Sequence, residues 1–335
     1  MTDDMTHGSP HGISVVVPVH QGERHLQAVV DELLPLVHPF LSPDRHLLQV
    51  VEIILVYDPG PDDSARVIRE LAEKHEIVRP VWLSRNFGQH AATLAGMASS
   101  GGDWVLTMDE DGQHDPGYVA AMLDCALRAS ASLVYARATN PPPHGLARNA
   151  TSRGAKRLLG LMTGSDRAAE FHSFRLMLGE IGRSVAAYAG SGVYLDVALG
   201  WVAGPHATCP VVLRDEGERR SGYSTRSLVS HFWRMVLTSG TRGLRLVSAV
   251  GAAFATVGIV AAIALVVNRL TDAGIMAGWT SNMVVILVTS GAVLFSLGVV
   301  AEYVGVAVNM AMGKPLYVIV NDPAKGPLGR VADDR

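Results

Sequence analysis

The sequence is poor in cysteine and in charged residues. Only Cys125 and Cys209 occur among its 335 residues, so there is no CxxC metal pair and no disulfide framework, and both thiols are expected to be apolar fillers. Lysine and arginine total 28 against 31 aspartates and glutamates, and the net charge of −3 provides no basic surplus for nucleic acid. Charged residues make up 18% and hydrophobic residues 48%, which is more apolar than an ordinary soluble enzyme.

The first residues also lack the features of a signal peptide. Residues 1–12 are polar and carry two aspartates, without a basic start or an apolar run. We therefore expect the first domain to stay in the cytoplasm. Most of the apolar excess lies beyond Arg242, which indicates a soluble part followed by a membrane part.

Short β-branched runs alternate with amphipathic stretches in the first third of the chain. Strands are expected at 13–19, 50–57, 78–83 and 104–108, and helices at 23–37, 64–74 and 91–99. Because the strands are apolar on both faces, the pattern predicts an α/β domain with a mainly parallel sheet between helices. Ligands of such sheets bind at the carboxyl ends of the strands, where polar turns follow here.

Two long uncharged runs lie near the C-terminus, at 246–268 and 273–301. At 1.5 Å per residue, either run can cross a hydrocarbon core of about 30 Å. We expect two transmembrane helices near 246–267 and 283–306, with a loop over the early part of the second run. A buried helical hairpin in a soluble domain is the alternative.

Basic residues predict the orientation of this hairpin. Arg242 and Arg245 precede it and Lys314 follows it, whereas its tip carries Arg269 opposed by Asp272. Since lysine and arginine favour the cytoplasmic side, both ends should lie inside. The expected parts are a catalytic domain, an amphipathic juxtamembrane segment, the hairpin and a cytoplasmic tail, at 1–225, 226–245, 246–310 and 311–335.

An acidic run directly follows the expected strand at 104–108. Side chains two apart on an extended segment point the same way, so Asp109 and Asp111 can converge. Two such carboxylates can hold Mg²⁺ or Mn²⁺, which takes its other ligands from a diphosphate and water and neutralises charge on a departing nucleoside diphosphate. An acidic turn without function is the alternative.

Polar residues also follow the second and third expected strands. Asp58 can accept hydrogen bonds from a base or ribose, although an aspartate that only caps a turn is equally consistent with this position. Arg85 and Asn86 could reach phosphate or sugar hydroxyls.

Five segments occur in an order that a known family shares. They are Val15-Val16-Val17-Pro18-Val19, Ser84-Arg85-Asn86-Phe87-Gly88, Met108-Asp109-Glu110-Asp111-Gly112-Gln113-His114, Ser173-Phe174-Arg175-Leu176 and Arg220-Ser221-Gly222-Tyr223-Ser224. Together with Gly278-Trp279-Thr280-Ser281, Glu302-Tyr303-Val304-Gly305 and Pro315-Leu316-Tyr317-Val318-Ile319, they resemble the family-2 glycosyltransferases that charge polyprenyl or dolichyl phosphate. Bactoprenol glucosyltransferases and dolichol-phosphate mannose synthase are examples. The resemblance covers about residues 13 to 320.

The resemblance implies a GT-A fold and a role for each matching residue. The donor side would include Pro18, Asp58, Arg85, Asn86, Asp109 and Glu110, with Asp109 and Asp111 at the metal. The catalytic set would be Asp111, Arg175 and Glu170, of which Arg175 contacts a phosphate and Glu170 has an open role. The acceptor phosphate would lie by Arg219, Arg220 and Ser224.

Three positions depart from the family's pattern. The family commonly has two aspartates after its second strand, whereas this chain has Tyr57-Asp58-Pro59. Glu110 adds a third carboxylate where the family usually has a small residue. Ser173 stands where the family often has an aspartate, which matters less if the attacking oxygen is an already ionised phosphate.

The sequence therefore predicts an inverting glycosyltransferase at the inner membrane, multi-pass, with a cytoplasmic catalytic domain. Its expected partners are a UDP- or GDP-linked sugar, polyprenyl phosphate and the bilayer, without nucleic acid; a homo-oligomer is left open. One alternative is transfer to another lipid such as diacylglycerol. The other is an inactive family member that acts as a membrane scaffold.

Overall fold

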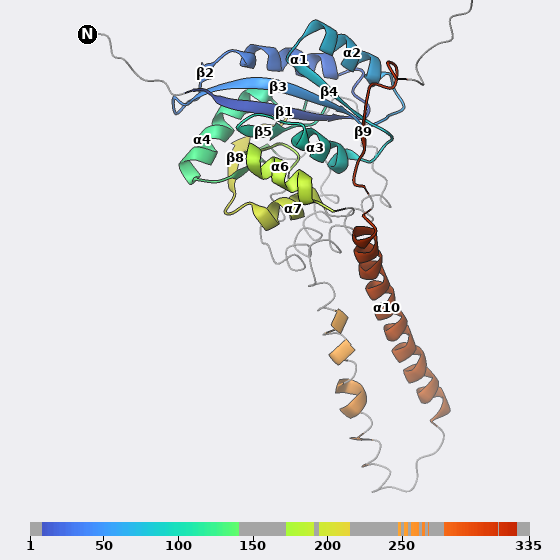
Figure 1. Ribbon diagram of the computed structural model, residues 1–335. Helices are drawn as coiled ribbons and strands as arrows, with labels where there is room; N and C mark the ends of the chain where they lie inside the picture. The colour runs from blue at the N-terminus through green and yellow to red at the C-terminus, as the bar shows by residue number, and fades with distance from the viewer. Residues whose placement is uncertain are drawn as a thin grey trace, which may run out of the picture.

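The computed structural model describes most of residues 9–214 and one long C-terminal helix. The described residues are 9–140, 172–190, 194–214, 247–248, 251–253, 256–260, 263–264, 267, 278–313 and 315–326. They form a sheet with helices on both faces, from which the long helix leads away (Figure 1).

The sheet has nine strands. These are β1 (His11–Val19), β2 (Phe40–Leu41), β3 (Leu47–Tyr57), β4 (Val78–Leu83), β5 (Trp104–Thr107), β6 (Leu133–Ala138), β7 (Arg175–Leu178), β8 (Ala207–Val211) and β9 (Ile319–Val320). Their order is β8-β6-β7-β5-β1-β3-β4-β9, with β2 beside β3. The central strands β5, β1, β3 and β4 are parallel to one another, and antiparallel pairing occurs at β2, β7 and β9. The predicted α/β fold with a mainly parallel, Rossmann-like GT-A sheet is confirmed.

The helices begin and end close to the predicted positions in the first part of the chain. They are α1 (Leu26–Leu33), the 3-10 turn η1 (Leu34–Val37), α2 (Ser64–Lys74), α3 (Gln89–Ala98), η2 (Pro116–Tyr118), α4 (Val119–Ala129), α6 (Gly179–Tyr188), α7 (Leu195–Val202) and α10 (Trp279–Ala311). The helix predicted at 23–37 changes to 3-10 geometry at Leu34, because Pro35 has no N–H to continue the α-helical hydrogen bonds.

Alternating side chains of the central strands fill two separate cores. Val15 and Val17 of β1 pack with α1, α2 and α4, whereas Val16 packs on the opposite face with α3, α6 and α7. All three valines are fully buried. This is why the strands are apolar on both faces, and it puts α6 and α7 on the face of the sheet nearer α10 (Figure 1).

One helix of the described residues is long and apolar enough to cross a membrane. Its candidate span is Val288–Val308, 21 residues with a mean hydropathy of 1.9, which is about 30 Å of helix. The structure describes the first predicted span, 246–267, only in short separate pieces, of which the longest is 256–260, so a pair of transmembrane helices is not confirmed. The loop expected before residue 283 is wrong from Trp279 onward, because α10 already begins there.

The chain returns to the sheet after α10, which the sequence analysis did not predict. Strand β9 pairs antiparallel with β4, matching Trp82 with Val320, and forms the edge of the sheet on that side. Asp322 then accepts two hydrogen bonds from Arg69, at 2.8 and 2.9 Å, and the Arg69 guanidinium lies 5.0 Å from the Trp82 ring centre. These contacts attach the segment that follows α10 to the edge of the sheet.

We expect Asp322→Ala to lower the free energy of unfolding by about 1–2 kcal/mol, because it removes a bidentate, partly buried ion pair. Glu70→Ala is the matched control, since it removes a carboxylate from an ion pair with Arg66 that is exposed on both sides and screened by solvent, so the loss should be smaller. Thermal unfolding of the full chain in detergent measures both. Equal losses in the two variants would contradict the proposed anchoring role of Asp322.

Candidate active site

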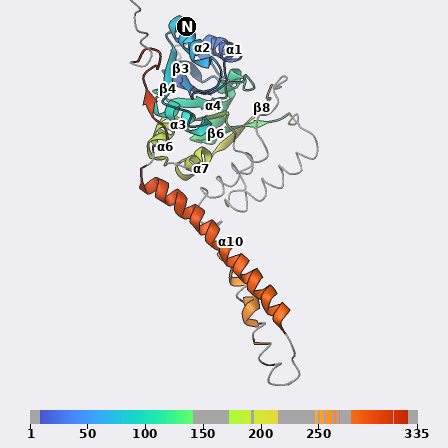
Figure 2. The same ribbon diagram turned by 90° about the vertical axis from the view of Figure 1, so that its right-hand side faces the viewer.

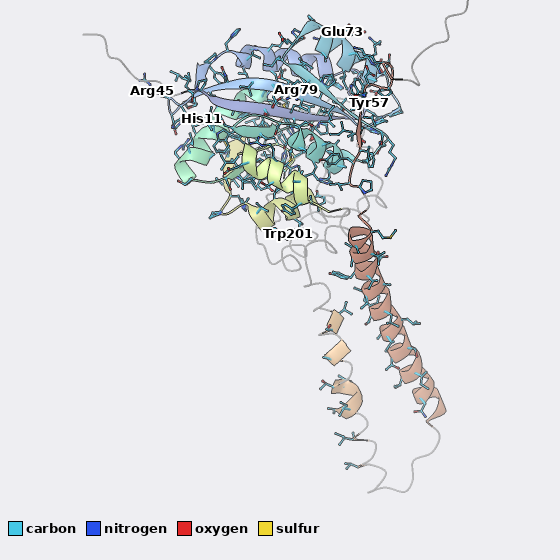
Figure 3. The ribbon with its side chains drawn as sticks, viewed as in Figure 1. His11, Arg45, Tyr57, Glu73, Arg79 and Trp201 are labelled. Carbon is cyan, nitrogen blue, oxygen red and sulfur yellow. The ribbon has the colours of Figure 1, made fainter. Side chains whose placement is uncertain are left out.

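The carboxyl ends of β1, β3, β4 and β5 meet at one edge of the sheet, since these strands are parallel neighbours. Figure 3 labels Tyr57, the last residue of β3, at the end of the sheet nearer α10, and His11, the first residue of β1, at the opposite end. This edge carries seven of the predicted site residues, namely Pro18, Asp58, Arg85, Asn86, Asp109, Glu110 and Asp111. The structure therefore brings the predicted donor side together at one place.

Asp58 is buried and shapes the turn after β4. Its two carboxylate oxygens accept the backbone N–H groups of Phe87 at 2.7 Å and Gly88 at 2.9 Å. Gly88 has a φ of +92°, a conformation that favours glycine. Asp58 thus positions the loop before α3, and its contact with a nucleotide base stays a prediction.

The loops after β1 and β3 pack tightly against each other beside Asn86. The Asn86 amide donates to the Pro59 carbonyl at 3.2 Å, and Nδ1 of His20 lies 3.1 Å both from that amide and from the Asp58 carbonyl. A Cβ at Gly60 would come 1.6 Å from the His20 carbonyl oxygen, so no side chain fits there. His20, which the sequence analysis missed, belongs to the same polar surface as Asn86.

Arg85 lies next to this surface and is exposed. Its guanidinium lies 3.9 Å from the ring centre of Phe87 and donates to the Asn86 carbonyl at 3.0 Å. The guanidinium therefore lies close to Asn86 and Phe87, and its contact with a phosphate stays a prediction.

Asp109 and Asp111 follow β5 and differ in their surroundings. Asp109 accepts hydrogen bonds from the Gln89 amide and the Ser173 hydroxyl, each at 2.6 Å, and burial raises the pKa of its carboxyl. One oxygen of Asp111 accepts the backbone N–H of Gln113 at 3.1 Å. Ser173 thus bonds to the acidic motif at the position where the family often has an aspartate.

The metal role of Asp109 and Asp111 stays a prediction, and two carboxylates after one strand are compatible with a divalent cation that takes further ligands from elsewhere. No group of three or more His, Cys, Asp or Glu side chains suited to a metal occurs in the part of the chain that the structure describes. Two protein carboxylates leave room for diphosphate oxygens and water, as Mg²⁺ prefers. Gln89 and Ser173 donate hydrogen bonds to Asp109, and both side chains are neutral. A bound cation would therefore also offset the cost of burying the Asp109 carboxylate.

Two histidines lie near Asp109, of which His114 is buried and His172 is half-buried. The His114 ring stacks on Phe174 at 4.8 Å and lies 5.3 Å from the His172 ring. Nδ1 of His114 accepts the backbone N–H of Asp109 at 3.0 Å, which leaves the proton on Nε2. Burial lowers the pKa of each imidazole to about 4, so both are neutral at pH 7. The sequence analysis quoted His114 in the acidic motif but gave neither histidine a role.

Glu110 binds the loop that follows β1. Its carboxylate accepts the backbone N–H of His20 at 2.8 Å and that of Gln21 at 3.0 Å. A Cβ at Gly22 would come 2.8 Å from the same carboxylate. Glu110 therefore joins the acidic motif to the loop that carries His20, and its predicted contact with the donor stays a prediction.

We expect Glu110→Gln to raise the KM for the nucleotide sugar by roughly fivefold. A glutamine amide has one neutral acceptor oxygen where the carboxylate has two charged ones, so the hydrogen bonds that position the His20 loop weaken by about 1 kcal/mol. The KM for the acceptor should stay near wild type. Glu23→Gln is the control, since Glu23 lies in the same loop after β1 but accepts one longer hydrogen bond, from the Asp63 backbone N–H at 3.3 Å. Steady-state kinetics with each substrate varied separately measure this. An unchanged donor KM in Glu110→Gln would contradict the positioning role.

Arg175 is buried beneath the acidic motif. Its guanidinium pairs with Asp196 of α7 and donates to the Thr107 hydroxyl at 3.1 Å. Tyr135 also donates to Asp196, at 3.0 Å. The structure thus gives the guanidinium interior partners that the sequence analysis missed, and the predicted phosphate contact stays a prediction. Glu170, Arg219, Arg220 and Ser224 lie outside the described residues.

Comparison with known proteins identifies the family of this region. Residues 14–180 match the protein family described as Glycosyl transferase family 2, and they include the whole strand edge described above. Residues 14–180 are a family 2 glycosyltransferase domain. The prediction that the chain is a glycosyltransferase is confirmed.

Relatives of the glycosyltransferase extend along almost its full length. Undecaprenyl-phosphate 4-deoxy-4-formamido-L-arabinose transferase of Pseudomonas aeruginosa is 29% identical over 317 residues, which are 92% of this chain and 89% of the relative. The glycosyltransferase YkcC of Bacillus subtilis is 26% identical and covers 91% of this chain and 92% of its own. Among solved structures, glucosyl-3-phosphoglycerate synthase of Mycobacterium tuberculosis with Mn²⁺ and UDP-glucose aligns with 69% of this chain and 79% of that chain, at 21% identity and a TM-score of 0.47.

Proposed function

We propose that this glycosyltransferase moves a sugar from a nucleotide sugar to polyprenyl phosphate at the inner leaflet of a membrane. The main observation behind this proposal is that the similarity to undecaprenyl-phosphate sugar transferases extends over most of the chain. The aligned region is 92% of the chain, far more than the 14–180 domain, so it includes part of the region around the apolar helix α10.

The strand edge supports the nucleotide-sugar half of the proposal. In this proposal the surface of His20, Pro59 and Asn86 binds the nucleoside, and Arg85 binds a phosphate. A divalent cation held by Asp109 and Asp111, Mg²⁺ or Mn²⁺, would neutralise charge on the diphosphate. Asp58 and Glu110 hold the loops that carry these groups in place through hydrogen bonds to their backbone N–H groups.

The proposed reaction is a single displacement. An acceptor phosphate oxygen forms a bond to the anomeric carbon while the bond from that carbon to the donor phosphate breaks, and the electron pair leaves with the nucleoside diphosphate. The anomeric configuration is therefore inverted. Because the attacking oxygen is already ionised at pH 7, positioning matters more than a general base, which is compatible with serine at position 173.

The acceptor side and the topology belong to the same proposal. Arg175, Arg219, Arg220 and Ser224 would lie around the acceptor phosphate, with Glu170 as the nearest carboxylate. Guanidinium groups suit this because they offer bidentate bonds to phosphate. The catalytic domain would face the cytoplasm, with 246–267 as the first of two membrane helices, since Arg242, Arg245 and Lys314 flank the pair.

Incubating the purified full chain with labelled UDP- and GDP-sugars and a short polyprenyl phosphate tests the proposal. We expect the sugar in the lipid phase, one nucleoside diphosphate released per sugar transferred, inversion at the anomeric carbon, and loss of transfer in chelator. If the sugar were transferred only to diacylglycerol, the proposed acceptor, polyprenyl phosphate, would be wrong. The absence of transfer from every nucleotide sugar, in a folded protein, would overturn the enzymatic assignment.

A further inference from the structure

Helix α7 ends in large apolar side chains that the catalytic site does not use. Trp201 is 56% exposed and Val202 is 38% exposed at its C-terminal end, and Tyr188 at the end of α6 is 43% exposed. The Tyr188 hydroxyl donates to the Ala198 carbonyl at 2.6 Å, which holds the end of α6 against the middle of α7. We call Tyr188, Trp201 and Val202 the α7 patch.

The α7 patch lies on the side of the domain that faces the apolar helix. Figure 1 and Figure 2 both show α7 at the lower surface of the sheet domain, toward the end of α10 that joins it. Figure 3 labels Trp201 on this lower surface, whereas Glu73 lies on the opposite side. A plane through the Val308 end of the candidate span therefore runs along the surface that carries the patch.

The composition of the patch suits the boundary between lipid headgroups and acyl chains. Tryptophan and tyrosine are enriched at that depth because their rings are apolar while the N–H and O–H remain hydrated. Solvent exposure of several neighbouring apolar side chains is otherwise unfavourable. Trp201 and Val202 project from the exposed end of a helix whose first five residues, 195–199, are buried.

The same helix begins at the catalytic site. The ring of Tyr194, just before α7, lies 4.1 Å from that of His90 at the start of α3, and Asp196 pairs with Arg175. A helix of eight residues is about 12 Å long, so the patch and the site lie one short helix apart.

We propose that the α7 patch inserts into the interfacial layer of the membrane and so fixes the height of the catalytic edge above the bilayer. The occupant is the lipid surface. This contact is additional to α10, and it does not depend on the identity of the donor or acceptor. It would hold the site at the level where a lipid-linked phosphate is presented, if the proposed function is correct.

A fluorophore placed at the patch tests this directly. The full chain carrying Cys125→Ala and Val202→Cys is labelled and placed in nanodiscs of phosphatidylcholine and phosphatidylglycerol. The distant control carries Cys125→Ala and Glu73→Cys, with Val202 unchanged. Cys209 should stay unlabelled, since its side chain is buried. We expect lipids brominated near the headgroup to quench the label at 202 but not at 73, because interfacial side chains reach about 5–10 Å into this layer.

A second pair of variants separates insertion from simple proximity. Adding Trp201→Glu should shift the emission of the label at 202 to the red and abolish its quenching by brominated lipid, whereas Trp201→Phe should preserve both. Transfer activity plays no part in either measurement, so failure of the proposed function would leave the result readable.

Three results would overturn the proposal. The first is quenching of the label at 202 by aqueous iodide as strongly as at 73. The second is a label at 202 that is protected from iodide, is not quenched by brominated lipid, and becomes more protected as the protein density rises. This result would mean that a second copy covers the patch. The third is protection that persists unchanged in detergent and ignores lipid, which would mean that another segment of this chain covers it.

Discussion

Replacing Asp111 by asparagine should lower the rate of sugar transfer by roughly 10²–10³-fold, the size of effect seen when a group that stabilises developing charge is removed. Asparagine is neutral and cannot supply the charge that a divalent cation requires. It can still accept the backbone N–H of Gln113, so the melting temperature should stay near wild type. Single-turnover rates measure the first effect and thermal unfolding measures the second, while calorimetric titration with UDP or GDP plus Mn²⁺ reports nucleotide binding.

Asp115→Asn is the matched control for this experiment. Asp115 follows the acidic motif, accepts the backbone N–H of Gly117 at 2.9 Å and lies 3.2 Å from Arg214, away from Asp109. Asparagine is as good a cap as aspartate, so this variant should keep its transfer rate. Full activity of Asp111→Asn, or an equal loss in both variants, would refute the assignment of Asp111 to the charged site.

Replacing Asp196 by alanine should lower the free energy of unfolding by about 3–5 kcal/mol, because it leaves the buried guanidinium of Arg175 without its counter-charge. Arg175 keeps its bond to the Thr107 hydroxyl, and Tyr135 loses the acceptor of its hydroxyl. Glu32→Ala is the control, since it breaks an exposed ion pair with Arg214 that contributes about 0–1 kcal/mol. Chemical unfolding of the full chain in detergent measures the difference.

The double variant Arg175→Met with Asp196→Leu separates the two roles of Arg175. It should be more stable than Asp196→Ala alone, because neither charge then remains buried without its partner. If Arg175 also binds a phosphate, this folded double variant should still fail to transfer sugar or show a raised acceptor KM. Wild-type kinetics in the double variant would leave Arg175 a purely structural role, and an Asp196→Ala variant as stable as Glu32→Ala would contradict the buried ion pair itself.

The sequence was most informative where short-range patterns determine structure. The runs at 13–19, 50–57 and 78–83 are strands in the structure, because β-branched residues that are apolar on both faces suit only a sheet covered on two sides. The strand edge could also be located, since the turns after parallel strands must lie together. Strand β9 was missed because a two-residue strand has no pattern of its own and depends on the free edge of β4.

The sequence by itself determined the α/β order, the acidic motif at a strand end and an apolar segment long enough to cross a membrane, all of which follow from composition and spacing along the chain. Only the tertiary structure decided what each polar side chain contacts. It bonds Asp58 to the Phe87 and Gly88 backbone, Glu110 to the His20 loop, and Arg175 to Asp196. The partners of Asp58, Glu110 and Arg175 are between 21 and 90 residues away, and a hydrogen bond depends on distance and angle in space, which spacing along the chain does not specify.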